Sequence, residues 1–207
     1  MAGDCDIKDV LRRQWERIAA AATQLDMQAL SRVQGWRNAK VLAHLAVQPV
    51  LLGRFLADAG AAGAAMCLEA NLAGTHALAE RIDTAARQGA EAGRVDFARQ
   101  AAAVDAALGA ADIDATITTV QGPIRLADYL RTRCVEAVVH GMDLQPPVPA
   151  DPAALAVTVE ALMAVLRARS PHLLPAAREL PAVELVDVAT GRAPTPAVLA
   201  PVMPLMT

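Results

Sequence analysis

Apolar residues recur at helical spacing in one segment of the chain after another, and this periodicity constrains the fold more than any other feature. In the first segment, one helical face carries Ile7, Val10, Leu11, Ile18 and Leu25. Glycine and proline residues separate the segments, as they do between helices. The sequence therefore predicts a mainly all-α fold. The helices that we expect span residues 7–30, 38–58, 66–88, 94–110, 126–143 and 153–168.

Composition favours close helix packing and narrows the classes of function. Of the 207 residues, 55% are hydrophobic but only 2% are aromatic, which favours packed helices over a β-sandwich. A net charge of -3 without a basic run argues against nucleic acid as a partner. No apolar run reaches the roughly 18 residues that a membrane span needs, and the N-terminus lacks the features of a signal peptide. Cys5, Cys67 and Cys134 are scattered, which suits a reducing compartment, so we expect a cytoplasmic protein.

Two stretches interrupt the helical pattern. Residues 114–120 are rich in β-branched residues and alternate in polarity, so a short strand or extended segment is expected before the last helix of the bundle. Residues 145–152 contain four prolines in eight positions, which cannot propagate a helix. We therefore divide the chain into a helical bundle, 1–145, and a Pro-rich linker with a short helical C-terminal extension, 146–207. In that extension, residues 182–189 and 197–206 are expected to form short helices.

Three residues in two segments carry the chemistry. Glu136 and His140 are four apart, so on a helix they leave the same face, and His44 interrupts an otherwise apolar stripe. Two imidazoles and one carboxylate can hold a divalent metal while leaving coordination positions open, which is typical of a catalytic site. The alternatives are a buried His44 with one hydrogen bond, a salt bridge of Glu136 with Arg133 or His140, and a buried polar network without metal.

The same segments resemble a known family. Residues Trp36 to Leu45 (WRNAKVLAHL) and the stretch from Thr118 to Leu144 are similar to the two signatures of mycothiol-dependent maleylpyruvate isomerases, which are DinB/YfiT-like metal-binding four-helix bundles. The resemblance covers roughly residues 7–145. It implies a DinB-like four-helix bundle whose metal ligands are His44, Glu136 and His140. Arg37 and Lys40 depart from the family pattern.

The resemblance also implies a function. The ion would be Zn²⁺ or a similar divalent metal, and mycothiol, the thiol of actinomycetes, would be the cosubstrate. A metal-bound thiolate would then act on a small electrophilic substrate, in an isomerase or an S-transferase (transferase chemistry needs the same residues). The alternative is a non-catalytic, sensory bundle that binds a metal or a small ligand.

Two further residues are candidates around this site. Asp143, one turn beyond His140, could orient that imidazole from the second shell, or could end the helix as a solvated acid. Arg192 lies in a tail that resembles the ending of the family's C-terminal segments and is the candidate for binding an anionic substrate; the alternative is an exposed arginine after a Gly191 helix stop. The tail is too short for the family's full C-terminal domain. We therefore expect the substrate-binding end of the pocket to differ from that of the isomerases, or to be completed by a second subunit in a homodimer.

Two other candidate ligands are set aside. His76 is outside the family pattern and is interpreted as a structural or surface residue. Cys134 lies about 120° around its helix from His140, so it is predicted to be a core thiol before it is a nucleophile or a ligand.

Overall fold

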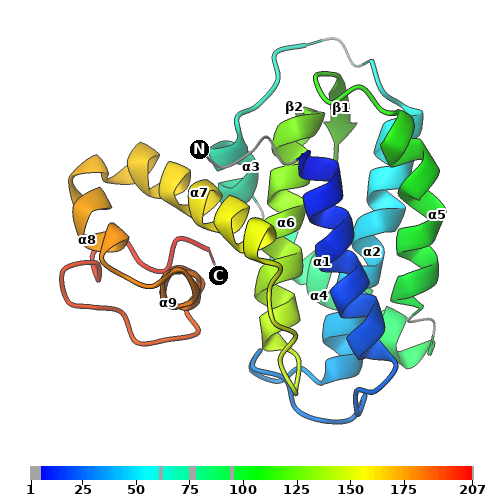
Figure 1. Cartoon of the computed structure of the whole chain (residues 1–207), viewed down its shortest axis with the longest axis horizontal. Helices are drawn as coiled ribbons and strands as arrows, with labels where there is room; N and C mark the ends of the chain where they lie inside the picture. Colours follow the sequence, from blue (N-terminus) through cyan, green and yellow to red (C-terminus); the bar gives the residue numbers. More distant parts are fainter. Residues whose placement is uncertain (1–5, 61–62, 75–77, 94–95, 207) are drawn as a thin grey trace.

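The protein is mainly helical in a computed structural model that describes residues 6–60, 63–74, 78–93 and 96–206 (Figure 1). This confirms the all-α fold class. The elements in chain order are α1 (Ile7–Ala22), α2 (Asn38–Ala57), α3 (Leu68–Gly74), α4 (Ala79–Glu91), α5 (Phe97–Ala110), β1 (Thr116–Thr119), β2 (Gly122–Arg125), α6 (Leu126–Asp143), α7 (Pro152–Arg169), a 3-10 turn η2 (Pro171–Leu173), α8 (Leu174–Arg178) and α9 (Ala182–Ala189).

Four long helices, α1, α2, α5 and α6, stand side by side as a bundle in Figure 1. α2 packs against α4 and α5, and α1 packs against α5 and α6. The apolar stripe predicted for the first helix is what α1 buries, with Val10, Leu11 and Ile18 almost inaccessible to solvent. The helix starts where Asp6 caps it by accepting from the Lys8 amide.

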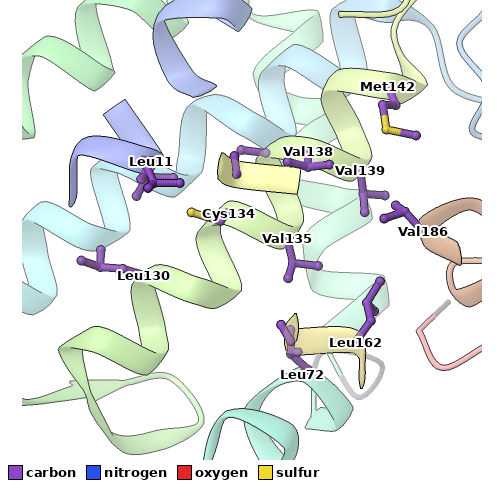
Figure 2. Close-up of a cluster of buried hydrophobic side chains, with 14 of the residues drawn as sticks. Leu11, Leu72, Leu130, Cys134, Val135, Val138, Val139, Met142, Leu162 and Val186 are labelled. Carbon is purple, nitrogen blue, oxygen red and sulfur yellow. The ribbon is translucent and has the colours of Figure 1, made fainter. Parts of the chain in front are cut away.

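Helix α6 is covered on two sides, and this matters for the site that it carries. Figure 2 shows Leu11 of α1 to one side of α6, and Leu72 of α3, Leu162 of α7 and Val186 of α9 to the other. Val135 and Val138 of α6 are fully buried between these neighbours. A polar side chain on such a helix is withdrawn from water and needs partners.

A small hairpin fixes the start of α6. β1 and β2 pair antiparallel, with Ile117 opposite Ile124, and both isoleucines are fully buried. Gly122 begins β2 with φ +122, a conformation that favours glycine. The extended segment expected before the last bundle helix is therefore present, and a second strand that the sequence did not predict follows it.

The C-terminal extension packs beside α6. α7 leaves the bundle at an angle, α8 lies near its far end, and α9 lies below α7 in this view (Figure 1). Asp151 fixes the start of α7, because its carboxylate caps the helix while its amide donates to Gln14 of α1. The helices expected at 153–168 and 182–189 match α7 and α9. Residues 197–202 form turns in place of the expected helix, and η2 and α8 were not predicted.

Two helix boundaries differ from the prediction. α1 ends at Ala22, because the Thr23 hydroxyl turns back onto the Ala20 carbonyl and the chain then turns at Asp26. The single helix expected at 66–88 is two helices, α3 and α4, and residues 75–77 between them lie outside the described residues. His76 is one of these residues.

By length and composition, α2 could cross a membrane, and it is the one helix of the described chain of which this is true. Half of the apolar stretch is buried inside the bundle, which is also the normal position of a core helix.

Candidate metal centre

His44, Glu136 and His140 meet between the two central helices. His44 lies on α2, and the other two residues lie one turn apart on α6. The Nε2 atom of His44 is 2.9 Å from Oε2 of Glu136, and Nε2 of His140 is 3.6 Å from the same oxygen. The three ligand atoms lie within 4.8 Å of one another. The structure therefore brings together the three residues predicted as metal ligands.

Trp36 holds the two imidazoles from the side. Its ring is stacked on that of His140, with centroids 6.5 Å apart, and meets that of His44 edge-on at 6.0 Å. The ammonium group of Lys40 lies 4.4 Å from the centre of the Trp36 ring. Sequence reasoning used Trp36 as part of a motif and gave it no role; its contact with both histidines depends on the turn that precedes α2.

Asp143 contacts the far side of His140. Its Oδ2 atom is 2.9 Å from Nδ1 of that ring, so Nε2 is the nitrogen that faces Glu136. Burial opposes ionisation of Asp143, but hydrogen bonds from His140 and Arg192 lower the pKa of this carboxyl to about 2. Asp143 is almost completely buried, so it does not end the helix as a solvated acid. The arrangement is the carboxylate–histidine pair commonly found behind a metal ligand.

Arg192 reaches the site from the C-terminal extension and binds Asp143. Its Nε and Nη2 atoms are 3.1 Å and 2.8 Å from the two carboxylate oxygens, and its Nη1 donates to the Thr190 carbonyl. The side chain is only 17% exposed. Arg192 is therefore not the exposed arginine of the alternative interpretation, and several of its donors already have protein acceptors. Its contact with an anionic substrate stays a prediction.

The protonation states of His44 and Glu136 favour the binding of a metal cation between them. Burial, and then the nearby His140, lower the pKa of His44, which favours the neutral imidazole that metals bind. Burial alone would raise the pKa of Glu136, but the hydrogen bond with His44, together with the nearby His140 and Arg133, holds it well below its usual range. A buried, ionised carboxylate next to two imidazoles is a suitable set of donors.

The two distances to Glu136 are also close to those in a metal site. Ligand atoms that bind one metal at about 2.0–2.2 Å in tetrahedral geometry lie about 3.4 Å from one another. The 2.9 Å and 3.6 Å separations to Glu136 lie on either side of that value. Three protein ligands leave positions open, as catalytic zinc sites do.

The group opens onto a cavity of about 910 Å³ between the bundle and the C-terminal extension. Trp36, Val139 and the three candidate ligands form the bundle wall. The extension provides the opposite wall from residues on and after α7 and α9, namely Arg169, Thr190, Gly191, Arg192, Pro204, Leu205 and Met206. Gly191 has φ +72, which allows the turn that brings Arg192 back toward the bundle.

Comparisons with known proteins agree on one family. The model of the mycothiol maleylpyruvate isomerase N-terminal domain matches residues 9–145. The chain belongs to this family. The crystal structure of the mycothiol-dependent maleylpyruvate isomerase superposes with a TM-score of 0.52 at 18% identity, over 77% of this chain and 67% of that chain, which shows a shared fold. No curated protein matches the chain.

The mycothiol maleylpyruvate isomerase N-terminal domain accounts for only one wall of the cavity. The matched region ends at residue 145, and it contains His44, Glu136, His140 and Asp143. Arg192 lies beyond it. The family match therefore covers the candidate ligands, whereas the opposite wall comes from a segment outside the match.

Proposed function

We propose that this protein is a metal-dependent enzyme that uses mycothiol as a cosubstrate and acts on a small electrophilic acid. The observation that carries the proposal is the cluster of His44, Glu136 and His140, open to a cavity of about 910 Å³, in a member of this family. The cavity is within the range of roughly 300–1,000 Å³ found for small-molecule sites. It has room for a thiol of mycothiol's size.

His44, Glu136 and His140 hold the divalent ion in this proposal, and the donor set suits zinc. A divalent ion bound there lowers the pKa of a coordinating thiol, so that the thiol is ionised at neutral pH. Asp143 keeps the His140 ring in the orientation that presents Nε2. Trp36 closes one side of both imidazoles and limits the access of water.

The reaction that this arrangement suits is conjugate addition. The thiolate sulfur forms a bond to one carbon of the double bond as the π bond opens, and the electron pair moves to the conjugated carbonyl. Rotation about the resulting single bond and return of the electron pair expel the thiolate and give the isomerised alkene. If a proton traps the adduct first, the net reaction is S-transfer. Both outcomes balance without an oxidant or reductant, and the same residues serve both.

Titration of mycothiol against zinc-loaded protein tests the proposal. We expect saturable binding that is lost in His44→Ala, followed by turnover of maleylpyruvate or of a related unsaturated keto acid. Absence of thiol binding at millimolar concentration would contradict the proposal. Binding without turnover of any acceptor would instead indicate a non-catalytic, thiol-binding bundle.

A further inference from the structure

A second, smaller pocket reaches the candidate metal centre from inside the bundle. Its volume is about 230 Å³, and it shares His44, Glu136 and Ile82 with the large cavity. Residues of α2, α3, α4 and α6 and of the hairpin turn line it. Its walls are mostly apolar, and they include Val47, Leu51, Phe55, Ala85, Val120 and Tyr129. His44 and Glu136 therefore face two compartments of very different size, whereas His140 faces the large cavity.

Arg81 and Arg133 both line the small pocket, and Arg133 is the one whose charge acts on Glu136. Its guanidinium lies 4.7 Å from the centre of the Tyr129 ring, donates to the hydroxyl of Thr132 through Nε and to the side-chain oxygen of Gln48 through Nη1. All of these acceptors are neutral. In the part of the chain that the structure describes, no carboxylate forms an ion pair with Arg133 within 4.0 Å.

Two of the arginines that line the large cavity, unlike Arg133, form ion pairs with carboxylates. Arg192 pairs with Asp143 at 2.8 Å, and Arg32 pairs with Asp187 at 2.9 Å. Arg133 is half-buried, and a charge withdrawn from water needs a counter-charge. Glu136 is nearby, but its carboxylate bonds to His44 and serves as a metal ligand in the proposed function. The pocket thus has a guanidinium with donors left for an anion.

We propose that the small pocket binds the carboxylate end of a small, planar, unsaturated acid, with the carboxylate on Arg133. This inference rests on the proposed function and deepens it, because it places the thiol in the large cavity and the acid in the small pocket. The amide nitrogen of Gln48 can donate a second hydrogen bond to the acid. Phe55 and Tyr129, whose rings meet edge-on at 5.6 Å, contact its apolar part beside His44 and Glu136.

The charges of the two ligands agree with this division. A divalent ion, ionised Glu136 and Arg133 together leave positive charge in excess, whereas Asp143 and Arg192 cancel each other. Arg81 in the small pocket and Arg169 in the large cavity add to that excess, so both compartments favour an anionic ligand such as a thiolate or a carboxylate. The volume also discriminates, since about 230 Å³ is below the roughly 300–1,000 Å³ of sites for drug-sized molecules and suits an acid of few atoms.

Fluorine NMR titration of 4-fluorobenzoate, an unreactive planar acid, tests the pocket directly in metal-free and in zinc-loaded protein. We expect saturable binding in both forms. Arg133→Gln should weaken it roughly 10- to 100-fold, the range for losing a charge-assisted hydrogen bond. Arg131→Gln is the matched control, because Arg131 is on the same helix, 44% exposed and paired with Asp128; it should leave binding unchanged. The neutral 4-fluorobenzamide should bind weakly to all three proteins.

A second variant tests the location if Arg133→Gln fails to fold. Ala85 is an exposed residue of α4 that also lines the pocket, so Ala85→Leu should reduce the pocket volume and weaken binding of 4-fluorobenzoate while Arg133 is retained. Equal affinity in the wild type, Arg133→Gln and Ala85→Leu would overturn the inference. Arg133-dependent binding of the acid in a protein that does not bind mycothiol would support the pocket and contradict the proposed function. Mycothiol binding without acid binding would overturn the pocket alone.

Discussion

The charged side chains on the two walls of the large cavity differ in whether they already have partners of opposite charge. On the bundle wall, Glu136 contacts two imidazoles, and no lysine or arginine of the described residues pairs with it within 4.0 Å, so its charge is available to a metal. On the extension wall, Arg192 is already neutralised by Asp143, and Arg169 donates to the Leu205 carbonyl. The bundle therefore presents a carboxylate that can still bind a ligand, whereas the charged groups of the extension mainly bind other protein groups and attach the extension to the bundle.

The two buried carboxylates of α6 show the same contrast within one helix. Glu136 and Asp143 are each bonded to a histidine, and burial opposes ionisation of both. Only Asp143 has an arginine partner among the described residues. The proposed function therefore uses Glu136 as a metal ligand, whereas Asp143 bonds to His140 and Arg192. The predictions below test this division.

The largest effect is expected from the ligands on the bundle wall. His44→Ala, Glu136→Ala and His140→Ala should each reduce zinc affinity by more than the roughly 10–100-fold that second-shell changes cost, and should remove most of the bound metal. Elemental analysis of protein purified without a histidine tag measures this. Stoichiometric metal in all three variants would contradict the assignment.

The next effect concerns the contact between the walls. Asp143→Asn removes one partner of a buried ion pair and leaves the Arg192 guanidinium without its counter-charge, which should cost about 3 kcal/mol of unfolding free energy. Urea denaturation of metal-free protein measures it. Arg192→Gln should also destabilise, and a double-mutant cycle should show coupling of about 2 kcal/mol. If Arg192→Gln raised only the KM of an acid substrate, its main role would be substrate binding.

The Asp143 contribution should depend on pH in a defined window. Its pKa is lowered from 3.8 to about 2 in the folded protein, so the stabilisation is fully present above pH 3.8 and is lost as the pH falls toward 2. The difference in unfolding free energy between wild type and Asp143→Asn should therefore be constant from pH 5 to 7 and should decrease below pH 4. A constant difference down to pH 2.5 would argue against an ion pair.

A somewhat smaller change should follow metal removal. Free zinc at about 100 times its Kd stabilises the folded protein by about 2.7 kcal/mol, which corresponds to roughly 5–10 °C in Tm for a chain of this size. Scanning calorimetry with and without a chelator checks this. Identical melting curves, at verified metal loss, would show that the bundle wall holds no native metal.

The smallest effect is the expected inertness of Cys134. Burial raises the pKa of this thiol to about 12, and its side chain points into the core between the helices (Figure 2). Iodoacetamide at pH 7.5 should therefore modify the exposed Cys67 and leave Cys134 unmodified, as read by peptide mass spectrometry. Rapid modification of Cys134 in folded protein would mean that α6 is less tightly covered than the structure shows.

Much of the fold and of the bundle wall could be predicted from local pattern. Residues four apart, such as Glu136 and His140, lie on the same face of any helix. His44, on a facing helix, completes the set of three candidate ligands. The β-branched run before α6 likewise predicted extended structure. Helix ends were predicted less well, since α1 ends at Ala22, where a hydroxyl and a turn compete with an apolar pattern that continues to Leu25.

The sequence by itself determined the helical class, the pair of Glu136 and His140 and the carboxylate one turn beyond them, because these depend on periodicity within a helix. His44, on another segment, was added to the set by the resemblance to the family. Only the tertiary structure decided what each arginine does. Arg192 and Asp143 are 49 residues apart and pair because the chain turns back after α9. Arg133 instead meets the neutral Gln48 of α2, and no carboxylate of the described residues forms an ion pair with it. Such pairings depend on which surfaces pack together, and the spacing of residues within one segment does not predict them.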